Sequence, residues 1–125
     1  MEKKHRAVAA EKQVDALLAK ADQLLTTAEK TPDRTSIYEN CRAAVRNLLV
    51  AYLELQEEST LPIADLAFDH LWEKCVARSP EILPLAANVG LFLNESVSIT
   101  TEEEAEILLD AANELWDFIF ASLPE

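Results

Sequence analysis

The sequence predicts an all-α protein, a single-domain up-and-down bundle of about five helices over residues 1–125. Half of the residues are apolar and 27% are charged, which is a globular composition with enough material for one hydrophobic core. The only glycine is Gly90, whereas tight β-hairpin turns commonly need glycine. Apolar residues recur with helical spacing, and the short connections between these segments favour antiparallel neighbouring helices.

Residues 1–30 form the expected leading helix. It begins near Lys4 and must end before Pro32, because the residue that precedes a proline is disfavoured in the α region. Whether this helix packs in the core or serves an interface stays open at this point. Its apolar positions follow a 3-4 spacing: Val14, Leu17, Leu18, Ala21, Leu24, Leu25 and Ala28.

A second helix is expected from Ser36 to about Gln56. Ser36 and Glu39 have the spacing of a capping box, in which each side chain binds a free backbone N–H at the start of a helix. Pro62 then suits the first turn of a third helix that ends near Arg78.

A fourth helix is expected from Ser79 to about Leu93, since Ser79 and Pro80 are residues that a helix start prefers. It has almost no polar face, so we expect it to be central. Residues 100–104 offer two overlapping capping boxes, Thr100 with Glu103 and Thr101 with Glu104, and predict a fifth helix to about Ser122. The expected core includes the middle of each apolar stripe, namely Leu48, Leu71, Val89 and Leu108.

Charge is distributed unevenly along a chain whose net charge is −12. Residues 79–125 contain ten carboxylates and no Lys or Arg, a stretch that would repel phosphate backbones, so nucleic acid is not a favoured partner. No apolar run approaches the roughly 20 residues that span a bilayer, and the N-terminus lacks the apolar segment of a signal peptide. We therefore expect a cytoplasmic location without membrane insertion.

Few residues suggest chemistry, and we expect no catalytic residue, cofactor or metal. Cys41 and Cys75 lie on apolar helix faces and are expected to be reduced core thiols. His70 is expected at the surface, because no second histidine stands at ligand spacing from it. The carboxylates of the last helix are expected to form a solvated face.

Tyr38, Arg42 and Arg46 lie four residues apart on the second helix and form one ridge. An aromatic ring beside two guanidinium groups could stack on and pair with a nucleotide or another small anion. The alternative is that both arginines pair with acids of a neighbouring helix.

The apolar arc of the last helix, about 200° wide, exceeds the roughly 100° stripe that one packed face needs. Either the helix lies between two neighbours of its own chain, or part of the arc is an oligomer surface. We expect a dimer or larger assembly with Leu115 and Phe118 at or near the contact. Cover of Phe118 by the leading helix is the rival interpretation.

Four segments carry a family resemblance: residues 43–53 (AAVRNLLVAYL), 61–66 (LPIADL), 101–106 (TEEEAE) and 116–119 (WDFI). Over residues 34–125 the chain resembles HEPN domains. That resemblance implies a helical, often dimeric domain, commonly encoded beside a small nucleotidyltransferase. The family includes ribonucleases as well as inactive members.

The sequence departs from the ribonuclease members of that family. They use an Arg followed roughly four to six residues later by a His for acid-base work, and neither His5 nor His70 has such an Arg before it. Ala64 stands where the family often has a His. The leading hypothesis is therefore a noncatalytic HEPN-like interaction or accessory protein that forms a homodimer or binds a protein partner, such as a small nucleotidyltransferase. The alternatives are a nucleotide or small-anion binding module and a HEPN-type ribonuclease.

Overall fold

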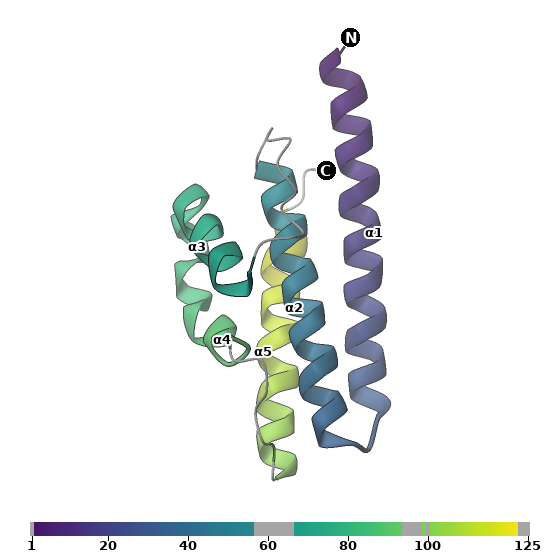
Figure 1. Cartoon of the computed structure of the whole chain (residues 1–125), viewed down its shortest axis with the longest axis vertical. Coiled ribbons are helices and arrows are strands. Elements are labelled where there is room, and N and C mark those ends of the chain that lie inside the picture. The colour runs from purple at the N-terminus through teal and green to yellow at the C-terminus, as the bar shows by residue number, and fades with distance from the viewer. Residues whose placement is uncertain (1, 57–66, 94–98, 100, 123–125) are drawn as a thin grey trace.

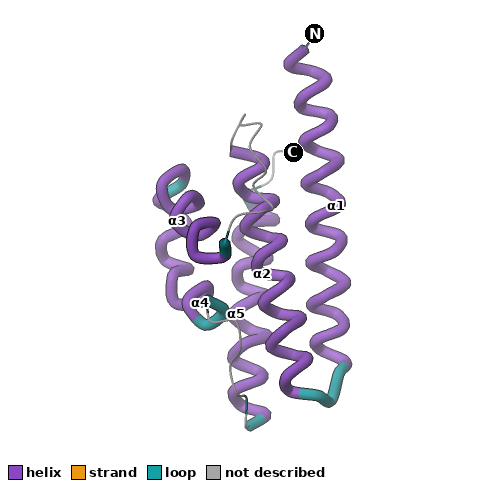
Figure 2. The backbone as a smooth tube through the Cα atoms, viewed as in Figure 1, coloured by secondary structure: helices purple, strands orange, loops and turns teal. Residues whose placement is uncertain are grey.

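The computed structural model describes residues 2–56, 67–93, 99 and 101–122. Within residues 2–56, the side chains are described for residues 14–54. The described part of the chain is helical and contains no strand, which confirms the all-α prediction (Figure 2). Its elements are α1 (Glu2–Lys30), α2 (Arg34–Gln56), α3 (Phe68–Arg78), the 3-10 helix η2 (Pro80–Leu85), α4 (Ala86–Gly90) and α5 (Glu102–Ala121).

The helix α2 is the centre of the molecule, because it packs against α1, α3 and α5 (Figure 1). Figure 1 shows α1 running antiparallel to α2, whereas α5 runs in the same direction as α2. The short helices α3, η2 and α4 form a column beside these long helices, and the first turns of α1 extend beyond the end of α2. Within the described residues, no helix is both long and apolar enough to cross a membrane.

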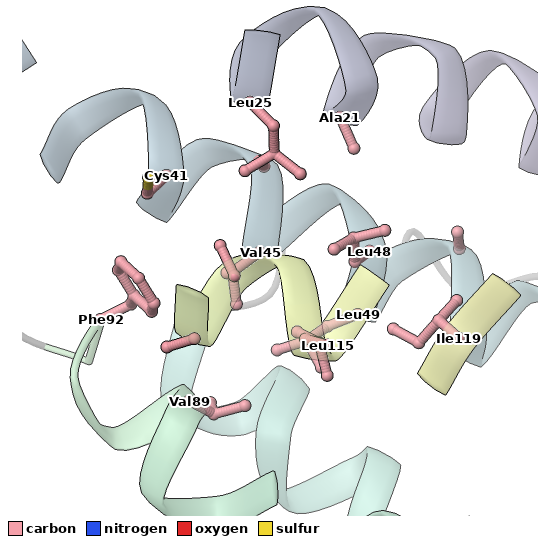
Figure 3. Packing of buried hydrophobic residues seen from close by; sticks show 14 of the residues in the cluster. Ala21, Leu25, Cys41, Val45, Leu48, Leu49, Val89, Phe92, Leu115 and Ile119 are labelled. Carbon is pink, nitrogen blue, oxygen red and sulfur yellow. The ribbon is translucent and has the colours of Figure 1, made fainter. Parts of the chain in front are cut away.

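The core lies where α1, α2 and α5 meet and continues under the short helices (Figure 3). The four expected core positions are confirmed, since Leu48, Leu71, Val89 and Leu108 are all buried. The question left open for the leading helix is also answered from residue 14 onward: its apolar stripe packs in the core through Val14, Leu18, Ala21, Leu25 and Ala28.

Capping side chains fix where α2 and α5 begin. The Asp33 carboxylate accepts a hydrogen bond from the Thr35 N–H at 3.2 Å and another from the Ser36 hydroxyl at 2.8 Å. The cap of α2 is therefore Asp33, and the prediction that Ser36 caps this helix was wrong. A carboxylate at this position accepts a hydrogen bond from a free N–H and is stabilised by the positive end of the helix dipole. Of the two threonines predicted to begin a capping box, Thr101 caps α5, accepting from the Glu104 N–H at 3.1 Å.

The third helix begins later than predicted. Ala67 has extended backbone angles, φ −62° and ψ 152°, so the helix that carries Leu71 starts at Phe68 rather than at Pro62. Pro62 itself lies outside the described residues. A proline suits a first turn but does not require a helix to follow it, and propensity alone did not place this boundary.

The predicted fourth helix is wrong both in form and in place. Residues 80–85 form the 3-10 helix η2, and only residues 86–90 continue as α-helix. Pro84 lies inside this stretch, where its missing N–H and its ring oppose an α-helical turn. The segment is not central either, because Leu83 is 53% exposed. Its apolar residues divide between the core and the surface.

Candidate functional site

Tyr38 and Arg42 hold the end of the segment that follows α4. The Tyr38 hydroxyl donates to the Leu91 carbonyl at 3.4 Å, and the Arg42 Nε donates to the Phe92 carbonyl at 2.9 Å. The Tyr38 ring stacks on Phe92 with 5.8 Å between ring centroids. The guanidinium carbon of Arg42 lies 4.9 Å from the centre of the Phe68 ring, which is within cation-π range.

Through these contacts, Tyr38 and Arg42 of the predicted ligand ridge are part of the packing between α2 and the segment that follows α4. Tyr38 is buried, so its ring has no open face on which a nucleotide could stack. Burial raises the pKa of Tyr38 above its ordinary value of 10.0, and the charge and hydrogen bond of Arg42 offset this only in part. Arg42 meets a carbonyl and a ring rather than the acids of the alternative interpretation, and Arg46 is half-buried.

A second polar link joins α2 to the short helices, and sequence analysis missed it. The Tyr52 hydroxyl donates to the Ser79 Oγ at 2.7 Å, and the Ser79 hydroxyl donates to the Glu81 carboxylate at 3.4 Å. Ser79 is buried, and it lies where α3 ends and η2 begins. Because a buried hydroxyl needs a hydrogen-bond partner, this pair fixes the junction of the two helices against α2.

The two predicted interface residues pack against other helices of the same chain. Leu115 is fully buried in the core, so its side chain exposes no surface of the single chain to a partner. Phe118 is half-buried and its ring lies 6.0 Å from the ring of Tyr52. Part of the cover of the Phe118 ring therefore comes from α2, whereas the rival interpretation had predicted that the leading helix covers it. The apolar arc of α5 is wide because α1, α2 and α4 all pack against this helix.

The structure places large apolar side chains on the surface at two other locations. The first, here named the α4 patch, consists of Leu83, Leu91, Leu93 and Ile107, which are exposed by 53%, 39%, 39% and 52%. The Asn88 side chain donates to the Ala111 carbonyl at 3.1 Å and to the Glu114 carboxylate at 2.9 Å. Leu91 follows Asn88 by one turn and Ile107 precedes Ala111 by one turn, so this contact joins the end of α4 to the part of α5 that follows Ile107.

The second location is an aromatic pair on the outer side of α5. Trp116 and Phe120 stack with 5.7 Å between ring centroids and 20° between ring planes. Phe120 is 56% exposed, whereas Trp116 is half-buried against the core. At about 100° per residue, the adjoining strip of the helix holds three exposed carboxylates, here named the acidic ridge: Glu106, Asp110 and Asp117.

The remaining candidates have structural or solvated settings. Cys41 and Cys75 are free and buried, and burial together with the negative charge of Glu29 raises the pKa of Cys41 to about 12. The His70 side chain is exposed, as predicted, and lies 3.8 Å from the Glu73 carboxylate. Within the described residues, no group of three or more His, Cys, Asp or Glu side chains could hold a metal ion.

Comparisons of the chain with protein-family models, with curated proteins and with solved structures gave no match. The α4 patch and the aromatic pair are consequently identified by their own geometry. A sequence signal for the patch exists in Pro84, which interrupts an otherwise apolar helical pattern and so predicts that the stripe cannot stay on one buried face.

Proposed function

We propose that this chain is a noncatalytic interaction protein that self-associates through the α4 patch. The observation that supports this is the position of four of the five large apolar side chains that are most exposed among the described residues. Three of the four lie in residues 80–93, a segment whose only charged residue is Glu81, and the fourth, Ile107, lies on α5 one turn before Ala111, whose carbonyl accepts from Asn88. Exposed apolar clusters of this kind mark interaction surfaces in monomeric folds.

The charge of the molecule favours this location for a contact between two copies. Each copy carries a net charge of −12, so two copies repel each other at most orientations. Residues 80–93, with Glu81 as their only charged residue, can approach their own copy at a smaller electrostatic cost than the acid-rich helix α5, and burial of apolar area then stabilises the contact. The resemblance to HEPN domains, which are often dimeric, supports the same proposal.

The experiment is light scattering with the purified chain at micromolar concentration, with a variant that carries both Leu83→Glu and Ile107→Glu. We expect a dimer mass for the wild type and a monomer mass for the variant, because a carboxylate is tolerated in water but not in a dry interface. Added salt should strengthen the dimer, since it screens the repulsion between copies.

Phe120→Glu is the matched control, since it removes an exposed apolar side chain from the other location. It should leave the dimer intact, and circular dichroism should show unchanged helix content in every variant. A monomeric wild type at these concentrations contradicts the proposal, and a dimer that survives the double substitution places the contact elsewhere.

No contact among the described residues supports the alternative functions. The buried ring of Tyr38 and the bound Nε of Arg42 favour a structural role over nucleotide or anion binding. A partner of the kind that the resemblance implies, a small nucleotidyltransferase, remains a proposal that co-purification tests. Incubation with labelled RNA tests the ribonuclease alternative.

A further inference from the structure

The aromatic pair on α5 is a surface separate from the α4 patch. Trp116 and Phe120 lie one turn apart and their rings stack, so the inner ring is anchored in the core while the outer ring faces solvent. Stacking fixes the orientation of the exposed ring before any partner arrives. A large, rigid, half-anchored aromatic surface is typical of the residues that dominate binding energy in interfaces.

The charge beside this pair is negative. The helix α5 carries seven Asp and Glu residues and no Lys or Arg. Among the residues that the structure describes, no Lys, Arg or His forms an ion pair with the acidic ridge of Glu106, Asp110 and Asp117. Three solvated carboxylates thus follow the helix beside the exposed ring, where a partner could bring the opposite charge.

These two features together indicate the chemistry of the occupant. A second copy would bring another α5 with seven carboxylates against the first, which is unfavourable because like charges repel at close range. A cationic partner gains twice, since Arg or Lys pairs with carboxylates and also stacks on the electron-rich faces of Trp and Phe. An amphipathic helix presents an apolar side chain and flanking cations at the required spacing.

We propose that α5 binds a cationic amphipathic helix of a partner protein. An apolar side chain of that helix packs on the Trp116–Phe120 pair, and its Arg or Lys residues pair with Glu106, Asp110 and Asp117. Electrostatic attraction brings the partner to the ridge, and the aromatic pair selects a helix that also offers an apolar face. This site does not depend on self-association at the α4 patch.

The test uses a set of synthetic helical peptides with Arg on one face and Leu at successive registers on the other. Binding is followed through the fluorescence of Trp116 in a Trp72→Phe variant, which leaves Trp116 as the single tryptophan of the chain. We expect saturable binding that weakens as salt rises. Phe120→Ala should weaken it about tenfold or more, and Asp110→Asn combined with Asp117→Asn should have a similar effect.

Two controls separate specific docking from general attraction to an acidic protein. Ile107→Ala, an exposed apolar residue on another side of α5, should leave the affinity unchanged, and peptides with Gln in place of Leu should bind markedly more weakly. Absence of binding by all registers overturns the proposal, and so does binding that ignores Phe120→Ala. Salt weakens this binding but strengthens the proposed dimer, so failure of one proposal is recognised independently of the other.

Discussion

The long helices and the column of short helices are held in different ways. Apolar side chains join α1, α2 and α5, and the buried stripe of α1 runs from Val14 to Ala28, with Ala21 and Leu25 facing the core in Figure 3. The segment from Phe68 to Leu93 also buries apolar residues, but polar side chains of α2 bind it in addition. The Tyr38 hydroxyl donates to the Leu91 carbonyl, and the Arg42 Nε donates to the Phe92 carbonyl. The Tyr52 hydroxyl donates to the Ser79 hydroxyl.

The difference follows from helix length. A long amphipathic helix satisfies its backbone internally and needs only an apolar stripe to pack. Short helices leave a large share of their carbonyls at free ends, and these need partners from elsewhere. Tyr38 and Arg42 of α2 supply such partners, which explains why the aromatic and basic pattern on that helix has a structural role.

The largest expected effect compares the same substitution in the two regions. Leu48→Ala in α2 and Leu71→Ala in α3 each remove a fully buried side chain, and each should lower the free energy of unfolding by about 2–5 kcal/mol. Leu48 should cost more, because its neighbours on three long helices cannot move into the cavity as easily as a short helix can. Urea unfolding of both variants measures this, and a larger loss at Leu71 would reverse our comparison.

A smaller effect is expected where α2 binds the junction of the short helices. Tyr52→Phe removes the 2.7 Å hydrogen bond to Ser79 but keeps the ring beside Phe118, and it should cost about 1–2 kcal/mol. A double-mutant cycle with Ser79→Ala isolates the pair. A coupling energy indistinguishable from zero would mean that apolar packing alone holds the column.

The smallest effect is expected at Gly90, the last residue of α4. A Cβ added at Gly90 meets no atom within 4 Å, and its φ is not positive. Gly90→Ala should therefore raise stability by about 0.5–1 kcal/mol, because alanine loses less backbone entropy on folding. Ala87→Gly, at an exposed position of the same helix, is the matched control and should lower the melting temperature where Gly90→Ala raises it.

The sequence was sufficient for the parts of the fold that depend on one helix at a time. The stripes of the long helices, the cap at Thr101 and core positions such as Leu48 follow from spacing and capping chemistry. The boundary at Phe68 and the break in residues 80–90 did not follow, because short segments contain too few turns for a periodic pattern to outweigh a proline.

The surface was harder to predict, because a helical wheel shows which residues share a face but not which neighbours cover it. Leu115 belongs to the apolar arc of α5 just as Phe120 does, yet the first is buried and the second is exposed. The partners of Tyr38 and Arg42 lie at residues 91 and 92. A contact across that separation is a property of the tertiary fold, which spacing along one helix cannot reveal.

The two buried thiols give each region its own chemical reporter. Cys41 lies in α2 within the long-helix core, and Cys75 lies in α3, where its thiol donates to the Leu49 carbonyl at 3.7 Å. Thiol reagents react with an accessible thiolate, and both thiols are fully buried; burial and the charge of Glu29 also raise the pKa of Cys41 to about 12, which disfavours its thiolate at neutral pH. Alkylation of either residue must therefore await an opening motion. The modification rate at Cys41 measures how often the long helices separate, and the rate at Cys75 measures how often α3 leaves α2.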